Sequence, residues 1–402
     1  MTGKEKKMEE VISAKNIGLR GVKVADTKIS DVDGERGNLI YRGYHICDLA
    51  SHSTFEEVSY LLLIGDLPTS EALKTFKEGL ISERAVPQTL HEWMKKMPST
   101  TQPMDVLQAA IPILAGYDPE LRDETKEANL RKALRLIAKV PNVVASWERI
   151  RKGLDPIAPS SDLNHAGNFL YMLSGIPPTP EIARDFDICL ILHAEHSFNA
   201  STFAGREVAS TRAHLYASVA AAVGALSGEL HGGANSEVMR MLNEIGEVER
   251  VRSWVSQRLR TGGRIMGMGH AVYRTEDPRA TILRGIAKNL ANRAGNPKWF
   301  ELSQAIEEAT KEEFRRLKGR EIYCNVDFYS ASVYHMMGIP TDLFTPVFAV
   351  SRISGWAAHI IEEKFAEAQP KPELYRPDAD YVGNYCGPQA CEYIPIEKRH
   401  GY

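Results

Sequence analysis

The stretch TFEEVSYLLLI, residues 54–64, has the pattern of a capped helix. Its first residue, Thr54, is of a type preferred at helix N-caps, and Glu57 stands three positions later, where a capping box needs a carboxylate. Gly65 follows the last apolar residue, as is common after a helix C-terminus. Because helical spacing of this kind recurs along most of the chain, the sequence predicts a mainly helical, all-α protein.

Ten further segments repeat the helical period: 70–84, 103–115, 124–139, 161–174, 180–193, 210–226, 235–245, 278–294, 298–317 and 344–368. Only residues 17–43 are typical of strands. They carry turn residues at Asp33-Gly34 and Gly37-Asn38, so we expect one or two small β-hairpins near the N-terminus. Strands nowhere alternate with helices, which argues against a doubly wound sheet.

The size and charge of the chain suggest two domains and an anionic ligand. Its 402 residues exceed the roughly 250–300 at which single cores stop growing. We predict a large helical domain (1–232 and 339–402) and a small one (233–338). The net charge of -3 argues against a nucleic-acid partner. Between 252 and 284, however, seven arginines stand against two acids, which is typical of an opening for polyanionic ligands.

The sequence also predicts a cytoplasmic protein. The longest apolar stretch, 213–226, is shorter than the ~20 residues that a membrane span needs. The N-terminus has no apolar signal core. The five cysteines are an odd number, which fits a reduced set. Cys386 and Cys391 lie close in sequence, but no second pair completes a metal site.

Two histidines stand among glycines, which let the backbone approach a ligand closely. His231 lies in GELHGGANSEV (228–238) and His270 in GRIMGMGHAVYRTEDPRA (263–280). Either could be an ordinary loop residue, but the glycines and nearby arginines favour a functional role. A helix expected from about residue 234 would favour a neutral His231, because helix N-termini carry positive partial charge. GMGHAV lacks the third glycine and the preceding strand of a dinucleotide fingerprint.

Three other positions have more than one interpretation. Asp327, in NVDFYSASVYHMMGIP (325–340), is a helix N-cap, a carboxylate for acid–base catalysis, or both. In HAEH (193–196) the spacing is not that of HExxH, so we predict no metal; His193 is expected to be buried and His196 to bind an anion. Arg352 interrupts an apolar helix and must meet a carboxylate of the protein or a ligand, because an unpaired buried charge is costly.

Taken in order, these motifs resemble the citrate synthase family in its short bacterial and archaeal type. The resemblance rests on HAEHSFNASTFAGR, GELHGGANSEV, GMGHAVYRTEDPRA, NVDFYSASVYHMMGIP and FAVSRISGWAAHIIE, and on the N-terminal GNLIYRGYHICDLA. It covers nearly the whole chain. It implies an almost all-helical homodimer whose active site lies between a large, dimer-forming domain on the oxaloacetate side and a small domain on the CoA side. A larger assembly stays open.

The resemblance also implies roles for individual residues. His231 would hold the acetyl thioester oxygen, Asp327 would take a methyl proton, and His270 would protonate the oxaloacetate carbonyl. The carboxylates would be bound by His196, Arg279 and Arg352, with Arg376 supplied by the partner subunit. CoA would contact Arg274, Arg320, Ile265, Gly267 and Gly269. Acetyl-CoA would be a substrate, and no cofactor or metal is expected.

Three alternatives remain. A 2-methylcitrate synthase would use propionyl-CoA with the same residues, and one methylene is worth only ~1–3 kcal/mol of discrimination. A citryl-CoA lyase would run the reaction towards cleavage. A helical module that only binds CoA or anions would not need His231, His270 and Asp327 together, so the trio argues against it.

Overall fold

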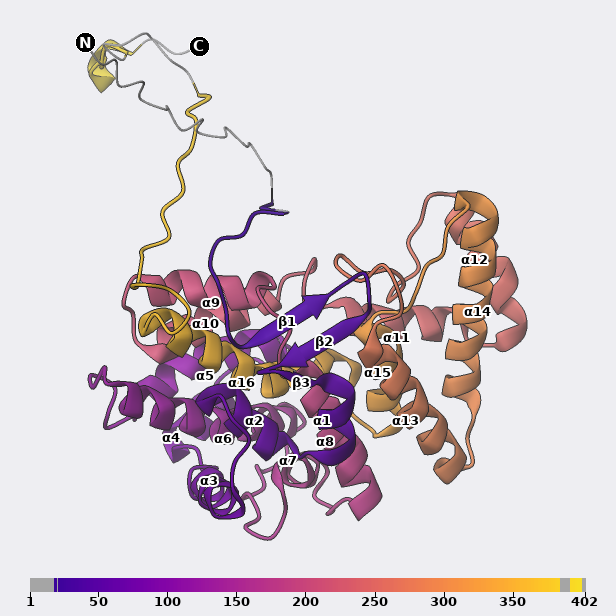
Figure 1. Ribbon diagram of the computed structural model, residues 1–402, viewed down its shortest axis with the longest axis horizontal. Coiled ribbons are helices and arrows are strands. Elements are labelled where there is room, and N and C mark those ends of the chain that lie inside the picture. Colours follow the sequence, from indigo (N-terminus) through magenta and orange to yellow (C-terminus); the bar gives the residue numbers. More distant parts are fainter. Residues whose placement is uncertain (1–17, 20, 384–390, 400–402) are drawn as a thin grey trace, which may run out of the picture.

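The computed structural model describes residues 18–19, 21–383 and 391–399, and most of them are helical (Figure 1). The helices are α1 (Ile46–His52), α2 (Phe55–Ile64), α3 (Ser70–Ser82), α4 (Gln88–Lys95), α5 (Pro103–Ala115), α6 (Lys126–Arg151), α7 (His165–Ser174), α8 (Pro180–His193), α9 (Ala200–Ser210), α10 (Leu215–Leu226), α11 (Ala234–Ile245), α12 (Val251–Arg260), α13 (Pro278–Ala294), α14 (Lys298–Lys318), α15 (Val326–Met336) and α16 (Phe344–Lys364). Three short 3-10 turns add η1 (Val248–Arg250), η2 (Thr341–Leu343) and η3 (Ile396–Lys398). The prediction of a mainly helical chain is confirmed.

The caps explain where α2 begins and ends. The Thr54 side chain accepts a hydrogen bond from the backbone N–H of Glu57 (3.3 Å), and Gly65 closes the helix at φ 108°, a left-handed conformation that glycine adopts without strain. The Glu57 carboxylate accepts from the hydroxyl of Ser53 (2.7 Å), just ahead of the cap. The predicted cap is therefore present, with Ser53 as its second polar partner.

Predicted helix bounds hold for 103–115, 180–193 and 278–294, and differ elsewhere for identifiable reasons. Helix α6 continues past the predicted end at 139, through Pro141, because residues 140–148 are buried and their packing outweighs the hydrogen bond that proline removes. Helices α7 and α10 start later than predicted, at residues capped by Asn164 and His214. Helices α1, α4, α9 and α12 were not predicted; each is at most eleven residues long.

The predicted hairpin is confirmed as β1 (Ser30–Asp33) and β2 (Asn38–Tyr41), paired antiparallel, and a two-residue strand β3 (Tyr44–His45) adds to β2. The hairpin turn reaches the segment that follows His270. The N–H of Arg274 donates to the Gly34 carbonyl (2.8 Å), and a Cβ on Gly34 would lie 2.3 Å from the Val272 carbonyl oxygen. The sheet thus supports a loop that carries a candidate site residue.

Helices α11 to α15 lie together at one side of the molecule, and α16 runs through the centre of the rest (Figure 1). Nearly all of α16 is buried, from Phe344 to Glu363. The segment after α16 leaves the body as an extended tail (Figure 1). Helices α11 to α15 fall within the predicted small domain, 233–338, but the domain division itself stays a prediction. Among the described residues, no helix is both long and apolar enough to span a membrane.

The cysteines differ from expectation at one place. Cys47, Cys189 and Cys324 are free, whereas Cys391 is disulfide-bonded. The expectation of a fully reduced set is therefore wrong for Cys391; it rested on the odd number of cysteines, which does not forbid a disulfide. Cys386 lies outside the described residues, as do all residues from 384 to 390.

Replacing Gly34 with alanine should destabilise the protein. The added methyl would meet the Val272 carbonyl at 2.3 Å, so the hairpin turn or the loop must shift, and overpacking of this kind costs ~1–3 kcal/mol. Gly285→Ala is the matched control: nothing lies within 4 Å of a Cβ there, and alanine should stabilise α13 by ~1 kcal/mol. Thermal unfolding measures both. Equal stability of the two variants would contradict the contact.

Candidate active site

Asp327 stands in the first turn of α15 with its carboxylate free. Asn325, not Asp327, caps this helix: its Oδ1 accepts the N–H of Asp327 (3.0 Å). The N-cap interpretation of Asp327 is therefore wrong, because the side chain of Asn325, two residues earlier, is the N-cap that accepts a backbone N–H of the first turn. Within the described part of the chain, no hydrogen bond or ion pair reaches the Asp327 carboxylate. Burial raises its pKa to about 6, although the Arg279 charge acts in the opposite direction.

The loop that carries His270 is fastened to the start of α15. The Gly269 N–H donates to the Tyr323 carbonyl (2.7 Å), the Asn325 N–H to Gly267 (2.9 Å), and the Asn325 side chain to Gly269 (3.0 Å). Gly267 has φ 74°, and a Cβ there would lie 2.9 Å from the Phe328 Cα. Only glycine fits so close to the helix. These contacts place the His270 loop beside Asp327.

His270 has a defined proton position. Its Nδ1 accepts the backbone N–H groups of Val272 (2.9 Å) and Tyr273 (3.1 Å), so the proton of the neutral ring is on Nε2. Burial, together with the charge of Arg279, lowers the pKa of His270 to about 4. His196 lies next to it, with ring centroids 5.4 Å apart, and its Nε2 is 3.2 Å from the Tyr273 hydroxyl. Burial also holds the pKa of His196 well below its usual value.

His231 presents the opposite nitrogen. Its Nε2 accepts the N–H of Ser201 (3.2 Å), so the proton of the neutral ring is on Nδ1. Burial lowers the pKa of His231 to about 4, and Arg352 contributes. The predicted helix begins at Ala234, three residues after His231. The neutral state expected from the helix terminus thus has burial as its main cause.

Two buried arginines, Arg279 and Arg352, act electrostatically on the candidate site residues. Arg279 is paired with Asp277 through two hydrogen bonds (3.0 and 2.8 Å). Arg352 donates from Nε to the His193 carbonyl (2.7 Å), and no carboxylate among the described residues lies within 4.0 Å of its guanidinium. Both charges act on the pKa values of Asp327 and His196, while Arg352 also acts on His231. Arg279 also lowers the pKa of His270, so each of the three candidate catalytic groups feels at least one of these two charges.

The residues expected to contact CoA line two adjoining pockets that share Phe314 and Ile322. One, of about 260 Å³, contains Gly269, His270, Arg274 and Arg320; the other, of about 300 Å³, contains Ile265, Gly267 and Arg264. Arg274 and Arg320 are exposed. The sequence prediction grouped these five residues, and the structure brings them together in two adjoining pockets, one of which contains His270.

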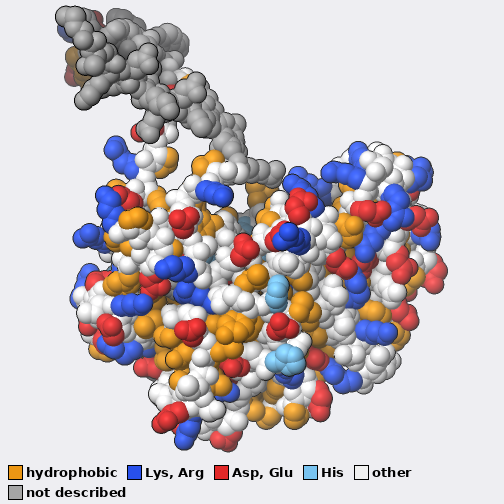
Figure 2. Space-filling view, viewed as in Figure 1, with side chains coloured by type: hydrophobic (Ala, Val, Ile, Leu, Met, Phe, Trp, Pro, Cys, Tyr) orange, Lys and Arg blue, Asp and Glu red, His pale blue; other side chains and the backbone are white. Residues whose placement is uncertain are grey.

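The basic stretch 252–284 is less basic in space than in sequence. Acids from α14 and the N-cap residue of α13, Asp277, pair with four of its seven arginines, in the contacts Arg252–Glu312, Arg260–Glu313, Arg279–Asp277 and Arg284–Glu307. Figure 2 accordingly shows Asp and Glu mixed with Lys and Arg over α12 and α14. The sequence predicted a broad opening for polyanions along this stretch. In the structure, Arg264 and Arg274 of the stretch line the two pockets, and Arg320 from farther along the chain lines one of them.

Two further expectations stay untested. Arg376 is exposed on the tail, next to Tyr375, which bonds Glu363 (2.6 Å) and stacks on Phe203. Its role towards a partner subunit remains a prediction.

No group of three or more His, Cys, Asp or Glu that could hold a metal occurs among the described residues. His193 is fully buried, as predicted.

Sequence reasoning missed the partners that orient the site. The Ser201 N–H donates to Nε2 of His231, the Tyr273 hydroxyl hydrogen-bonds to Nε2 of His196, and Asp277 forms an ion pair with Arg279. Asp277 lies two residues from Arg279, a spacing that could have suggested the pair. Ser201 and His231 are thirty residues apart, and no sequence signal connects them.

Fold and site together define a mainly helical enzyme that places a buried carboxylate and two imidazoles of lowered pKa near two buried arginines. The chain matches the family profile "Citrate synthase, C-terminal domain" over residues 18–378. Citrate synthase 2 of Bacillus subtilis is 45% identical over 383 residues, 95% of this chain and 98% of that protein. A 2-methylcitrate synthase of Shewanella oneidensis is 38% identical over 383 residues, 95% of this chain and 97% of that protein.

A solved structure agrees with these relatives. The citrate synthase of Thermoplasma acidophilum, in a ternary complex with carboxymethyl coenzyme A and oxaloacetate, aligns with a TM-score of 0.87 and 32% identity. The alignment covers 95% of this chain and 98% of that one. The chain belongs to the citrate synthase family.

Proposed function

We propose that this chain condenses acetyl-CoA with oxaloacetate and water to give citrate and CoA. The proposal rests on Asp327, whose pKa is raised to about 6 by burial, and on the imidazoles of His231 and His270. Backbone N–H groups donate to one nitrogen of each ring, so the ring proton is on Nδ1 of His231 and on Nε2 of His270. A carboxylate of raised pKa is a stronger base than usual, and neutral imidazoles donate hydrogen bonds without being strong acids. Such a set suits enolisation of a thioester.

In the first step Asp327 takes a proton from the methyl group of acetyl-CoA. The electron pair moves towards the thioester oxygen, and the Nδ1–H of His231 donates a hydrogen bond to it. A fixed donor at a developing oxyanion typically contributes ~2.7–4 kcal/mol. Because the pKa of His231 is held low by burial, the ring stays neutral and an enol-like intermediate is favoured.

In the second step the enol carbon attacks the ketone carbonyl of oxaloacetate, and the Nε2–H of His270 protonates the new alkoxide. The proton that Asp327 took from the methyl group restores the His270 ring, so both side chains return to their starting forms. Arg279, Arg352 and His196 bind the substrate carboxylates. Arg352 is best suited to this, because no carboxylate of the described residues pairs with its buried guanidinium, which can form paired hydrogen bonds with a substrate carboxylate. Water then hydrolyses the citryl thioester, releasing CoA. Closure around oxaloacetate would keep water away until then.

The remaining expectations belong to the same proposal. The large and small domains would meet at this site, with CoA on the side of residues 233–338. A homodimer would add Arg376 from the partner subunit. The reaction as written balances without a metal or another cofactor, and we propose a cytoplasmic location.

The acyl group is tested by measuring thiol release with oxaloacetate and either acetyl-CoA or propionyl-CoA. We expect kcat/KM to favour acetyl-CoA by about 10- to 200-fold, the range that one methylene can supply. The greater identity to a citrate synthase than to a 2-methylcitrate synthase supports this direction. Assays without oxaloacetate are the control for simple thioester hydrolysis. A preference for propionyl-CoA would establish the 2-methylcitrate alternative, and no thiol release from either would remove the enzyme assignment.

A further inference from the structure

His196 lies on the turn between α8 and α9, next to a strained residue. Ser197 has φ 51°, in the left-handed region that non-glycine residues seldom occupy. Such a conformation persists only where surrounding contacts hold it. Because Ser197 directly follows His196, the groups that hold Ser197 also set the backbone from which the His196 ring projects.

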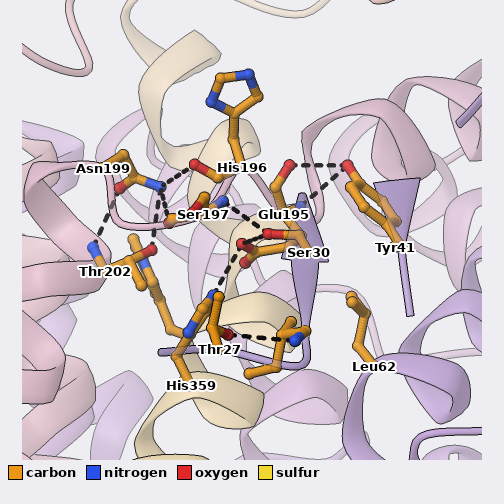
Figure 3. Close-up of polar contacts among 12 residues, drawn as sticks. Thr27, Ser30, Tyr41, Leu62, Glu195, His196, Ser197, Asn199, Thr202 and His359 are labelled. Carbon is orange, nitrogen blue, oxygen red and sulfur yellow. Dashed lines mark hydrogen bonds and ion pairs between the residues drawn. The ribbon is translucent and has the colours of Figure 1, made fainter. Parts of the chain in front are cut away.

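The N-terminal sheet holds this turn on both sides of His196 (Figure 3). On one side, the Ser197 N–H donates to Ser30 Oγ (3.0 Å), and that hydroxyl donates to Glu195 Oε1 (2.9 Å). On the other side, the Tyr41 hydroxyl donates to the Glu195 carbonyl (2.8 Å) and accepts the Glu195 N–H (3.2 Å). Figure 3 shows the His196 ring pointing away from this cluster.

The Glu195 carboxylate joins the turn to α16. Its Oε1 also bonds His359 Nε2 (2.8 Å), and a Cβ on Gly355 would lie 2.3 Å from its Oε2. Burial opposes ionisation of Glu195, but His359, Arg352 and Ser30 together hold its pKa below the usual value. Helix α16 also carries Arg352. The cluster therefore connects the two segments that present His196 and Arg352.

We propose that Ser30 and Tyr41 are positioning residues that set His196 for oxaloacetate. This rests on the proposed function, in which His196 binds a carboxylate of that substrate. Neither residue touches the substrate in this proposal; they act through the peptide groups that flank His196. Without the Ser30 hydroxyl, the Ser197 N–H loses its acceptor and Glu195 Oε1 loses one donor. The turn at Ser197 can then relax away from its strained conformation.

The test is Ser30→Ala, with KM measured separately for each substrate. Removing two hydrogen bonds should raise the KM for oxaloacetate by roughly 5- to 30-fold. The KM for acetyl-CoA should stay within about twofold, because His231 is held by other contacts. Ser30→Thr keeps the hydroxyl and should restore the wild-type value. Ser51→Ala, which removes an exposed hydroxyl that donates to the Cys47 carbonyl within α1, is the matched control. An unchanged KM for oxaloacetate, or an equal rise in both KM values, would overturn the proposal.

Calorimetric binding of oxaloacetate alone separates this proposal from the proposed function. If the wild type binds no oxaloacetate and releases no thiol, the proposed function fails. If the wild type binds and Ser30→Ala binds equally well, only the positioning role fails. Tyr41→Phe acts on the opposite side of His196 and should weaken oxaloacetate binding in the same selective way, so it decides the matter if Ser30→Ala does not fold.

Discussion

Replacing Asp327 with asparagine should lower kcat by about 10²- to 10⁴-fold, the usual contribution of a positioned acid or base. Asparagine keeps the size of the side chain but cannot accept the methyl proton. Substrate binding should change little, because oxaloacetate is assigned to His196, Arg279 and Arg352. The measurement is thiol release from acetyl-CoA at saturating oxaloacetate, with the exposed Asp31→Asn as a control that should keep the wild-type rate. A variant that retains more than half of the wild-type kcat would refute the assignment.

A loss of folding would not explain this result. Burial raises the pKa of Asp327 to about 6, above its value in the unfolded chain, so the protonated form is favoured in the folded state. The stability that this group contributes is present below its unfolded pKa and is lost as the pH rises through about 6. At pH 8 the variant should therefore unfold at or above the wild-type temperature.

The same pKa sets the pH dependence of the wild type. The base must be ionised, so kcat/KM for acetyl-CoA should fall as the pH is lowered through about 6 and level off above it. His231 and His270, with pKa values of about 4, stay neutral across this range. A rate that stays constant down to pH 5 would contradict a base of raised pKa.

Local patterns predicted most of the helices because each pattern is satisfied within its own segment. Helix α2 begins and ends at the residues that cap it, Thr54 and Gly65. Where packing decides, prediction failed: α6 runs through Pro141 because the surrounding residues are buried, and strand β3 is two residues that pair only because β2 is already in place. Neither cause is visible in a short window of sequence.

The site shows the same division. His231, His270 and Asp327 could be singled out because glycines or uncharged neighbours surround them. The groups that fix their protons and orientation could not, because Ser201 and Ser30 are brought to the site by tertiary contacts with residues far away in the chain. For Asp327, the interpretation as a cap was wrong by two residues, since Asn325 takes that role.

Replacing His231 with alanine should lower kcat by about 10²- to 10³-fold, as expected for loss of one donor to a developing oxyanion. The Nδ1–H of His231 is free to donate because Ser201 occupies Nε2. The exposed His45→Ala is the control and should keep the wild-type rate.

The pH profile of the His231 variant separates a neutral donor from a titrating acid. Burial, opposed by Arg279 and Arg352, sets the pKa of Asp327, and none of these depends on the His231 ring. The variant should therefore reach a lower plateau with its inflection still near pH 6. If the inflection vanished with His231, the imidazole and not the carboxylate would be the group that titrates, and the division of labour between a carboxylate base and an uncharged donor would be wrong.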